Sequence, residues 1–277
     1  MICETKGEEM MIRHNKDIVG FFLRHLSIAS RIIGKLLAIR YLLLVLLIVT
    51  AALFLVVDVS AAPASPQINY VSNSTAVNIA ANRSVDEKGT ITVVTMTLNQ
   101  QDYKWKAYVG NVSGTLALDD ANVKSIYDWS LATITGEIYV SRASSVTWTN
   151  VSCVNQTVID NEQSFFGITS SARDSINSTF NHTVHTSFLV GAKNISASSC
   201  RSAFTYVNDA AQAISEAANF QEVLLRDGIN GNLIYTTILE QDQPAYDGGS
   251  TYDFQLIVAE NESGITPTNY YFYVELG

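Results

Sequence analysis

The sequence predicts a mainly β protein, with an antiparallel, sandwich-like exported domain that contains one to three short helices and follows an N-terminal transmembrane or signal helix. Three observations support this prediction. Residues 41–57 form an uncharged apolar run, residues 104–148 contain short β-prone segments between turns, and residues 251–277 contain stretches that alternate apolar with polar positions. A period of two indicates half-buried strands, and short strands between regular turns are typical of antiparallel sandwiches.

The apolar run decides which side of a membrane the rest of the chain occupies. As a helix its seventeen residues extend about 25 Å, which is close to the roughly 30 Å hydrocarbon core of a bilayer. Basic residues precede the run and Asp58 follows it. The positive-inside rule therefore makes residues 1–40 a basic cytoplasmic lead and exports the chain that follows the run.

Residues 41–61 are either a retained transmembrane anchor or a cleaved signal peptide. The small residues Ala61 and Ala62 fit the cleavage rule, whereas the run exceeds the usual length of about 7–15 residues and has a long basic lead, which favours an anchor. Arg40 and Tyr41 offer no small residue before the run, and the run lacks an early glutamate, which argues against a pilin leader. Both remaining interpretations export the chain from about residue 62 onward.

The charge of the chain changes after the apolar run. Before Pro63 the sequence has seven Lys and Arg against five Asp and Glu, and from Pro63 onward it has ten against twenty-one, a net charge of −11. Such a domain is repelled by nucleic acid and by anionic lipid, so we expect no nucleic-acid partner. The partners we expect are the membrane, through the N-terminal helix, and surface glycans or other envelope proteins.

Two of the three cysteines lie in the exported part. Cys3 lies on the cytoplasmic side, so Cys153 and Cys200 have only each other as partners after export. In an oxidising compartment two cysteines of one domain most simply form a disulfide. Closing a loop of this length adds up to about 4 kcal/mol to the free energy of unfolding in the chain-entropy model.

Nine Asn-x-Ser/Thr sequons follow the apolar run, roughly twice the number expected by chance. Sequons are acceptors for N-glycans on the surface of exported proteins. The predicted glycosylation sites are Asn73, Asn82, Asn111, Asn150, Asn155, Asn177, Asn181, Asn194 and Asn261.

The exported chain begins with a tether. Residues 62–89 are rich in Ser, Asn and Ala and predict a spacer with a first weak strand at 69–72, after which residues 90–277 form the β-rich domain. Residues 90–98, TITVVTMTL, are rich in β-branched residues but change phase, which predicts a strand with a bulge. Residues 104–148 predict a series of short strands with the three tryptophans in the core.

The pattern changes midway through the domain. Apolar residues at mixed three- and four-residue spacings predict short helices at 156–166 and 170–180, with Ser, Asp and Asn as caps. Residues 182–190 return to a strand pattern. Residues 208–220 form the strongest helix candidate of the exported part, because Asn208 can cap it and its apolar residues share a face.

The C-terminal part has the clearest strand pattern. Residues 222–226 and 232–239 flank a glycine-containing turn, which predicts a hairpin. Residues 251–259 and 269–277 alternate apolar and polar positions, so each predicts a half-buried strand.

Aromatic, acidic and glycine motifs are spread over most of the chain after about residue 68. They are Trp105-x-x-Tyr108-x-Gly110-Asn111-x-Ser113-Gly114, Leu118-Asp119-Asp120, Ile126-Tyr127-x-Trp129, Gly136-Glu137-Ile138-Tyr139, Trp148, Cys153, Tyr246-Asp247-Gly248 and Tyr252-Asp253-Phe254. In these motifs the chain resembles an uncharacterised family of β-rich secreted surface proteins of small-genome archaea. The resemblance implies an archaeal cell-surface setting and supplies neither catalytic residues nor a mechanism.

The sequence contains no HExxH, GxSxG, Walker or dinucleotide motif. His182 and His185 are the only exported histidines, and their spacing places them on opposite faces of a strand, which argues against shared metal ligation. Oxygen-rich turns can bind calcium, but the spacing here does not match an EF-hand, and Asp or Asn that bonds its own backbone is the simpler role. The candidate calcium ligands are Asp119, Asp120, Asn122 and Asp128. No other cofactor is expected.

Aromatic side chains on the last predicted strand are candidate binding residues. Tyr271 and Tyr273 lie opposite the face that carries Tyr270 and Phe272. Exposed aromatic rings on a sheet can stack on sugars or contact a protein, whereas a sheet covered on both faces uses them as core.

These features together predict an extracellular cell-surface protein, membrane-anchored or secreted, that acts in binding or adhesion or as an envelope component, without catalysis. One alternative is a pilin-like or envelope-assembly subunit that polymerises through strand edges. A second alternative is an extracellular hydrolase that acts on glycans and uses paired carboxylates.

Overall fold

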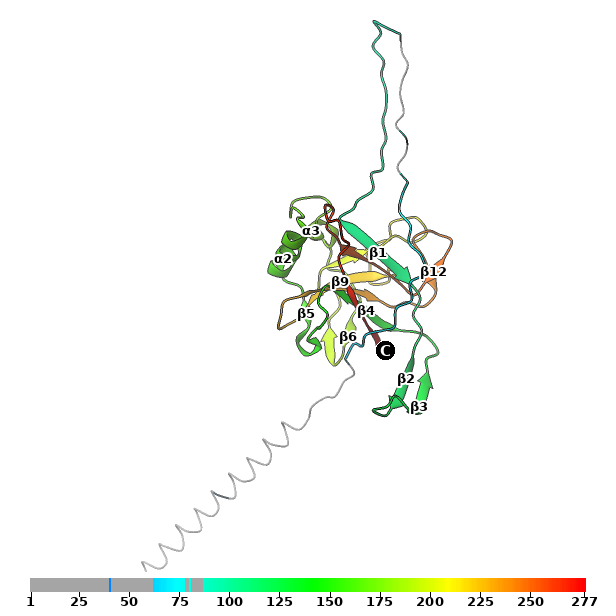
Figure 1. Cartoon of the computed structure of the whole chain (residues 1–277), viewed down its shortest axis with the longest axis vertical. Coiled ribbons are helices and arrows are strands. Elements are labelled where there is room, and N and C mark those ends of the chain that lie inside the picture. Colours follow the sequence, from blue (N-terminus) through cyan, green and yellow to red (C-terminus); the bar gives the residue numbers. More distant parts are fainter. Residues whose placement is uncertain (1–39, 41–61, 78–79, 81–86) are drawn as a thin grey trace, which may run out of the picture. The chain divides into compact units, whose positions relative to one another are not determined.

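The computed structural model describes residues 40, 62–77, 80 and 87–277 (Figure 1). The chain divides into the units Met1–Val59 and Ser60–Gly277, and every element described below belongs to the second unit. The predicted anchor or signal helix at 41–61 lies outside the described residues, as do Cys3 and Asn82. No helix in the described part of the chain is long and apolar enough to cross a membrane.

A six-stranded antiparallel sheet forms the centre of this unit. Its strand order is β14 (Tyr271–Leu276), β4 (Gly136–Ser141), β10 (Leu233–Ile238), β9 (Gln221–Arg226) and β5 (Ser152–Cys153), with β8 (Ser202–Phe204) also paired to β9. Strands β9 and β10 form the predicted hairpin, with Leu233 opposite Arg226 and Thr237 opposite Glu222. The prediction of a mainly β chain with antiparallel strands and few helices is confirmed.

The remaining strands form four two-stranded sheets. They are β1 (Trp105–Gly110) with β13 (Phe254–Ala259), β2 (Thr115–Asp119) with β3 (Ser125–Ser130), β6 (Phe188–Val190) with β7 (Lys193–Ile195), and β11 (Gln243–Pro244) with β12 (Thr251–Tyr252). The strand predicted at 251–259 is interrupted at Asp253. The buried carboxylate of Asp253 accepts hydrogen bonds from the N–H groups of Val112 and Asp242, at 2.7 and 2.9 Å, and this polar junction separates β12 from β13.

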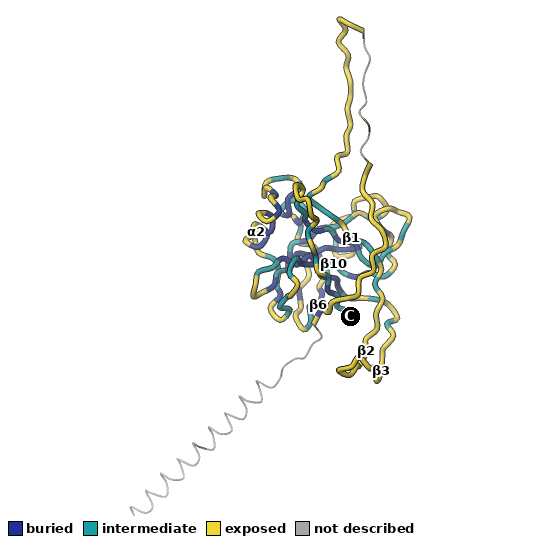
Figure 2. The backbone as a smooth tube through the Cα atoms, in the orientation of Figure 1, coloured by how far each residue is buried: buried dark blue, intermediate teal, exposed yellow. Residues whose placement is uncertain are grey.

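Both faces of the central sheet are buried. On one face Tyr235 belongs to a core that includes apolar side chains of β13, α2 (Gln156–Phe166) and α3 (Ile176–Thr179). On the other face Ile234 belongs to a second core with Phe188 of β6. Neighbouring residues of one strand point to opposite faces, so the burial of both Ile234 and Tyr235 shows that the sheet is covered on both sides (Figure 2).

The helix predicted at 156–166 is confirmed as α2. The side-chain oxygen of Asn155 accepts a hydrogen bond from Val158 N at 3.0 Å and caps the first turn, and Gly167 ends the helix with a left-handed φ of 67°. The helix predicted at 170–180 is wrong for most of its length, because only one turn, α3, is helical.

Residues 208–220 do not form the predicted helix. Asn208 and Asp209 adopt positive φ angles of 53° and 56°. Their N–H groups donate to the carbonyl oxygens of Ala245 and Tyr246, at 2.8 and 2.7 Å. Hydrogen bonds to a distant segment therefore satisfy the backbone where a helix would begin, and they override a favourable local sequence.

Three predicted strands are missing or shortened. Residues 69–72 and 90–98 are exposed and belong to no strand, and only β6 is a strand within 182–190. Ala64 instead exchanges two backbone hydrogen bonds with Val274 of β14, at 2.9 and 2.8 Å. High β-propensity does not make a strand without a neighbouring strand to accept its hydrogen bonds.

The region from 104 to 148 largely follows its prediction. It forms β1, β2, β3 and β4, and the expected final strand is replaced by the 3-10 turn η1 (Trp148–Asn150). Trp148 packs against Tyr139 and Tyr273 with ring centroids 5.1 Å from each, so it has the predicted core role. The predicted core role is wrong for Trp129, which is 50 % exposed because nothing in the described part of the chain covers β3.

Candidate functional site

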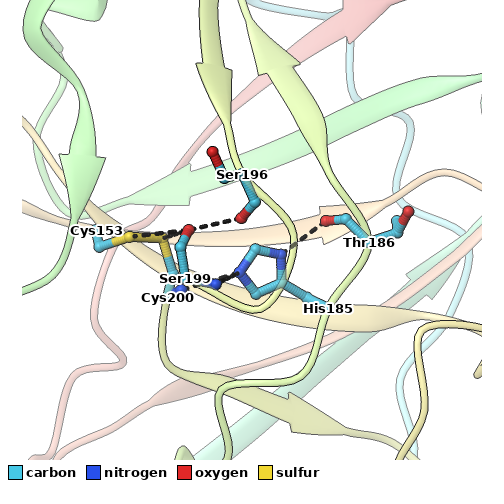
Figure 3. The surroundings of a disulfide bond; sticks show 6 residues. All are labelled: Cys153, His185, Thr186, Ser196, Ser199 and Cys200. Atoms are coloured by element: carbon cyan, nitrogen blue, oxygen red, sulfur yellow. Dashed lines mark hydrogen bonds between the residues drawn. A yellow bond between two sulfur atoms is a disulfide. The ribbon is translucent and has the colours of Figure 1, made fainter.

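The disulfide forms between the predicted pair and joins the central sheet to the segment before β8 (Figure 3). The Cα atoms of Cys153 and Cys200 are 4.9 Å apart and lie 47 positions apart in sequence. Cys200 is buried and belongs to the second core. The bond thus fastens the covering segment of that core to β5.

His185 holds the backbone next to this disulfide. Its Nε2 accepts hydrogen bonds from Ser199 N and Cys200 N, at 3.1 and 2.9 Å, and its Nδ1–H donates to Thr186 O at 2.7 Å (Figure 3). The fully buried ring is therefore a neutral imidazole with both nitrogens in use. No group of three or more metal-binding side chains occurs among the residues that the structure describes.

The candidate calcium ligands lie on the β2–β3 hairpin, and the carboxylate of Asp120 serves the turn. Its Oδ1 accepts hydrogen bonds from Asn122 N and Lys124 N, both at 2.8 Å. These bonds, chiefly the one from Lys124, lower the pKa of Asp120. Asp119 ends β2, while Asp128 lies within β3 opposite Ala117. The arrangement is a turn whose acidic side chain binds its own backbone.

Two carboxyl groups meet on the face of the sheet that carries the second core. Glu137 of β4 lies directly opposite Glu275 of β14. The hydroxyl of Tyr139 lies 3.5 Å from Oε2 of Glu137 and 3.1 Å from Oε2 of Glu275. Gly191 N donates to both oxygens of Glu275 at 2.9 Å. Burial, together with the charge of Glu275, raises the pKa of Glu137 to about 8.

This pair combines the groups that acid–base chemistry uses, namely a carboxylic acid that stays protonated near neutral pH and a neighbouring carboxylate. Strand β6 and the turn after it contact this pair: the hydroxyl of Tyr139 also donates to Leu189 O of β6 at 3.1 Å, and Gly191 N of the turn donates to Glu275. Its present contacts therefore tie β14 and β4 to that turn. The sequence did not reveal this pair because 137 and 275 are brought together only by strand register.

A hollow of about 300 Å³ lies elsewhere, beside the end of β4 and the turn before β10. Arg142 lines it and forms two hydrogen bonds to Glu162 of α2, from Nε at 2.9 Å and Nη2 at 2.6 Å. The guanidinium carbon also lies 3.6 Å from the ring centre of Phe165. Since Glu162 is buried, this ion pair fixes α2 on the sheet.

The two candidate binding aromatics of β14 differ in exposure. Tyr271 is 45 % exposed and remains a candidate for surface contacts. Tyr273 is only 7 % exposed, meets Trp148 edge to face and donates its hydroxyl to Ala143 O at 3.1 Å. An exposed binding role for Tyr273 is therefore wrong, because the segment that carries Trp148 covers this part of the face.

Most of the described sequons lie at the surface. The exposed acceptors are Asn73, Asn111, Asn150, Asn155, Asn181 and Asn194, whereas Asn177 and Asn261 are half-buried. The side-chain oxygen of Asn177 already accepts hydrogen bonds from Gln156 Nε2 and Arg201 Nη1, at 3.0 and 3.3 Å. Six acceptors are thus open to modification, and glycosylation itself stays a prediction.

The hairpin β2–β3 exposes an apolar face. Leu116 lies opposite Trp129, and Leu118 lies opposite Tyr127, so these four side chains share one face of the two-stranded sheet. Their exposed fractions are between 43 % and 60 %. The tyrosine and tryptophan rings contact each other with centroids 5.0 Å apart. Every residue of both strands is exposed, so the described part of the chain leaves this face open.

A second exposed apolar surface is formed by residues 87–101, which we call the arm. All of its residues are exposed and none belongs to a helix or strand. The large apolar side chains of the arm are Ile91, Val93, Val94, Met96 and Leu98. In Figures 1 and 2 the arm runs along an extended loop at one end of the unit, and the β2–β3 hairpin projects at the other end.

No protein-family model, curated protein or solved structure matches this chain. The resemblance to archaeal surface proteins therefore stays a prediction from the motifs alone. The described features that bear most directly on function are the two exposed apolar surfaces, the arm and the face of the β2–β3 hairpin.

Proposed function

We propose that this chain is an extracellular cell-surface protein that is anchored through residues 41–57 and acts by binding, as a component of the cell envelope. The observation that carries this proposal is the arm, fifteen consecutive exposed residues that include five large apolar side chains. Beside it, we infer a sandwich-like domain in which the central sheet packs between the β1–β13 and β6–β7 ribbons.

The exposure of the arm is extreme for apolar side chains. Ile91 is 97 % exposed, Val93 is 93 % exposed and Met96 is 86 % exposed. Contiguous exposed apolar residues on a soluble domain indicate a surface that a partner covers. Because the arm is β-prone and pairs with no strand in the described part of the chain, it fits the addition of one strand to the sheet edge of a partner.

The remaining support comes from the export features. The disulfide suits an oxidising compartment, and the sequons and acidic charge suit a solvated outer surface. All of them follow the apolar run in the sequence, as a single export event requires. The resemblance to archaeal surface proteins agrees with this setting.

The export part of the proposal is tested by N-terminal sequencing of the mature protein and by membrane fractionation. An intact N-terminus in the membrane fraction is expected for a retained anchor. A mature chain that begins near residue 62 and is found in the medium would replace the anchored form with a secreted one.

The binding part is tested with the unit 60–277 on isolated cell envelopes stripped of the native chain. Replacing Val94 and Met96 by Lys should weaken retention at least tenfold, because both side chains lose apolar contact. The matched control replaces Gln100 and Gln101 by Lys, which adds the same charge at exposed polar positions of the same arm. Equal retention of both double variants contradicts a role for the arm.

A second candidate function is an envelope subunit that polymerises through strand edges, and β14 is the observation that favours it. Among the residues that the structure describes, Ala64 alone pairs with the outer side of β14, through the two bonds to Val274, which leaves most of that edge open to an added strand. Sedimentation of the unit 60–277 distinguishes the two functions. In this assembly the arm of one copy supplies the strand added to the β14 edge of the next. Polymers that grow with concentration and that Val94→Lys abolishes support self-assembly, and a strict monomer contradicts it.

A further inference from the structure

We infer that the apolar face of the β2–β3 hairpin lies on the lipid surface of the membrane that carries this chain. This inference rests on the proposed function in one respect, the retained anchor. Its partner is the interfacial region of a neutral bilayer, the zone of headgroups and upper acyl chains. Four side chains would enter that zone: Leu116, Leu118, Tyr127 and Trp129.

The composition of this face matches a membrane interface. Tryptophan and tyrosine concentrate at the level of the lipid headgroups, and leucine contributes apolar area below them. On the opposite face Thr115 pairs with Ser130 and Ala117 pairs with Asp128, and Ile126 is the one large apolar side chain there. The two faces therefore differ in composition, and the aromatic rings lie on only one of them. A two-stranded hairpin is marginally stable by itself, and burial of one face against lipid would stabilise it.

The root of the hairpin lies close to the place where the chain joins the sheet. A Cβ atom on Gly114, the residue before β2, would lie 2.5 Å from the side chain of Leu276. Leu276 is two residues from Val274, the residue of β14 that pairs with Ala64. Two strand residues span about 7 Å. Figure 1 shows the hairpin and the carboxyl terminus at the same end of this unit.

Chain length limits how far this end can lie from the membrane. The apolar run ends at Val57, seven residues before Ala64. Seven residues span at most about 25 Å when fully extended. The strands β2 and β3 contain five and six residues, which is a length of about 17–20 Å. A retained anchor thus keeps the hairpin within reach of the bilayer surface, and the arm leaves from the opposite end.

Lipid fits this face better than a second copy of the chain. Four half-exposed side chains of this kind offer roughly 400 Å², about half of the 800 Å² that each partner contributes to a stable protein interface. The anchor already holds the chain at the membrane, so the hairpin meets lipid at a high effective concentration and a small apolar face suffices. The hairpin carries Asp119, Asp120 and Asp128 against one cation, Lys124. Its net charge is therefore negative, so anionic headgroups repel it and a neutral lipid surface is favoured.

Depth-dependent quenching of tryptophan fluorescence tests the contact. The full chain is reconstituted in phosphatidylcholine liposomes with and without bromine on the upper acyl chain. Trp105 donates to Asp174 O and Trp148 packs between Tyr139 and Tyr273, so both tryptophans belong to the folded body. We expect quenching in the wild type, and we expect Trp129→Phe to remove at least half of it.

Two single lysine substitutions on opposite faces of the hairpin provide a matched pair of variants. Leu118→Lys places a cation on the apolar face and should remove quenching of Trp129, whereas Ile126→Lys places it on the other face and should retain it. Both residues are exposed, so both variants should fold. Equal quenching in the wild type and Trp129→Phe overturns the inference. Protection of Trp129 that appears only at high protein density also overturns it, because that result shows that a second copy of the chain covers this face.

Extraction of the same liposomes at alkaline pH separates this inference from the proposed function. A chain that remains in the bilayer while Trp129 is unquenched retains the anchor and loses only the hairpin contact. A chain that is extracted contradicts the retained anchor itself, and the inference falls with it.

Discussion

The free energy of unfolding is expected to depend on pH through Glu137. Burial and the charge of Glu275 raise the pKa of Glu137 from 4.5 to about 8, so between these values the folded chain binds more protons than the unfolded chain. The stabilisation is complete below the unfolded pKa and is lost as the pH rises through the folded pKa. The full difference is about 5 kcal/mol. Relaxation and water entry reduce it to about 2–4 kcal/mol.

Glu137→Gln isolates this contribution, because Gln has nearly the same shape and is neutral at every pH. The variant should match the wild type within about 1 kcal/mol at pH 5 and exceed it by about 2–4 kcal/mol at pH 9. Urea unfolding of the unit 60–277 with its disulfide intact measures both differences.

Two controls make this comparison specific. Burial also raises the pKa of Glu222 well above its usual value, but Glu222 is present in both chains and cancels in the difference. Glu216 is exposed, so Glu216→Gln should give the same offset at pH 5 and pH 9. If Glu137→Gln also gives the same offset at both pH values, the reasoning is refuted.

Three further substitutions test the packing, each by its urea unfolding midpoint. Replacing Cys153 and Cys200 by Ala should cost about 4 kcal/mol for a loop closed across 47 positions, and wild type reduced with dithiothreitol should behave alike. Tyr273→Ala should cost about 3 kcal/mol because the ring is buried, whereas Tyr271→Ala should stay within about 0.5 kcal/mol. Arg142→Ala should cost about 3 kcal/mol, since it leaves a buried carboxylate of α2 without its partner. An unchanged midpoint of the disulfide variant, Tyr273→Ala or Arg142→Ala contradicts the role assigned to those residues.

Local signals in the sequence were sufficient wherever the structure itself is local. The hairpin of β9 and β10 needs only two β-prone segments and a glycine-containing turn between them. Helix α2 needs an amphipathic spacing, Asn155 before it and Gly167 after it, and all are visible in the sequence. The cysteine pair needed only the expectation of export and a count of two cysteines after the apolar run.

Predictions failed where distant segments decide the backbone. Residues 208–220 have helix-forming composition, but Asn208 and Asp209 bond to the segment at Ala245 and Tyr246 instead. Residues 90–98 have strand composition, yet no described segment pairs with them. The first failure comes from a tertiary contact that competes with the helix, and the second from the absence of such a contact in the described part of one chain.

The candidate surfaces were predictable only in part. The sequence reveals Tyr127 and Trp129 as aromatic, but pairing with Leu116 and Leu118 is needed to place all four on one face. The cluster around Glu137 depends on the register of β4 and β14, since a shift by one residue would turn its partner to the other face. Register is a long-range property here, because the two strands are separated by most of the domain.

The two exposed surfaces are arranged so that one molecule can use both. The arm and the hairpin leave opposite ends of the unit (Figure 1), and among the described residues no hydrogen bond or core cluster joins them. Changes at such distant sites are additive. We therefore expect Met96→Lys to weaken envelope retention without changing the quenching of Trp129 by brominated lipid, and Leu118→Lys to do the reverse. A loss of both properties in either single variant would show that the surfaces act as one site, and it would contradict a protein that spans from its own membrane to a partner farther out.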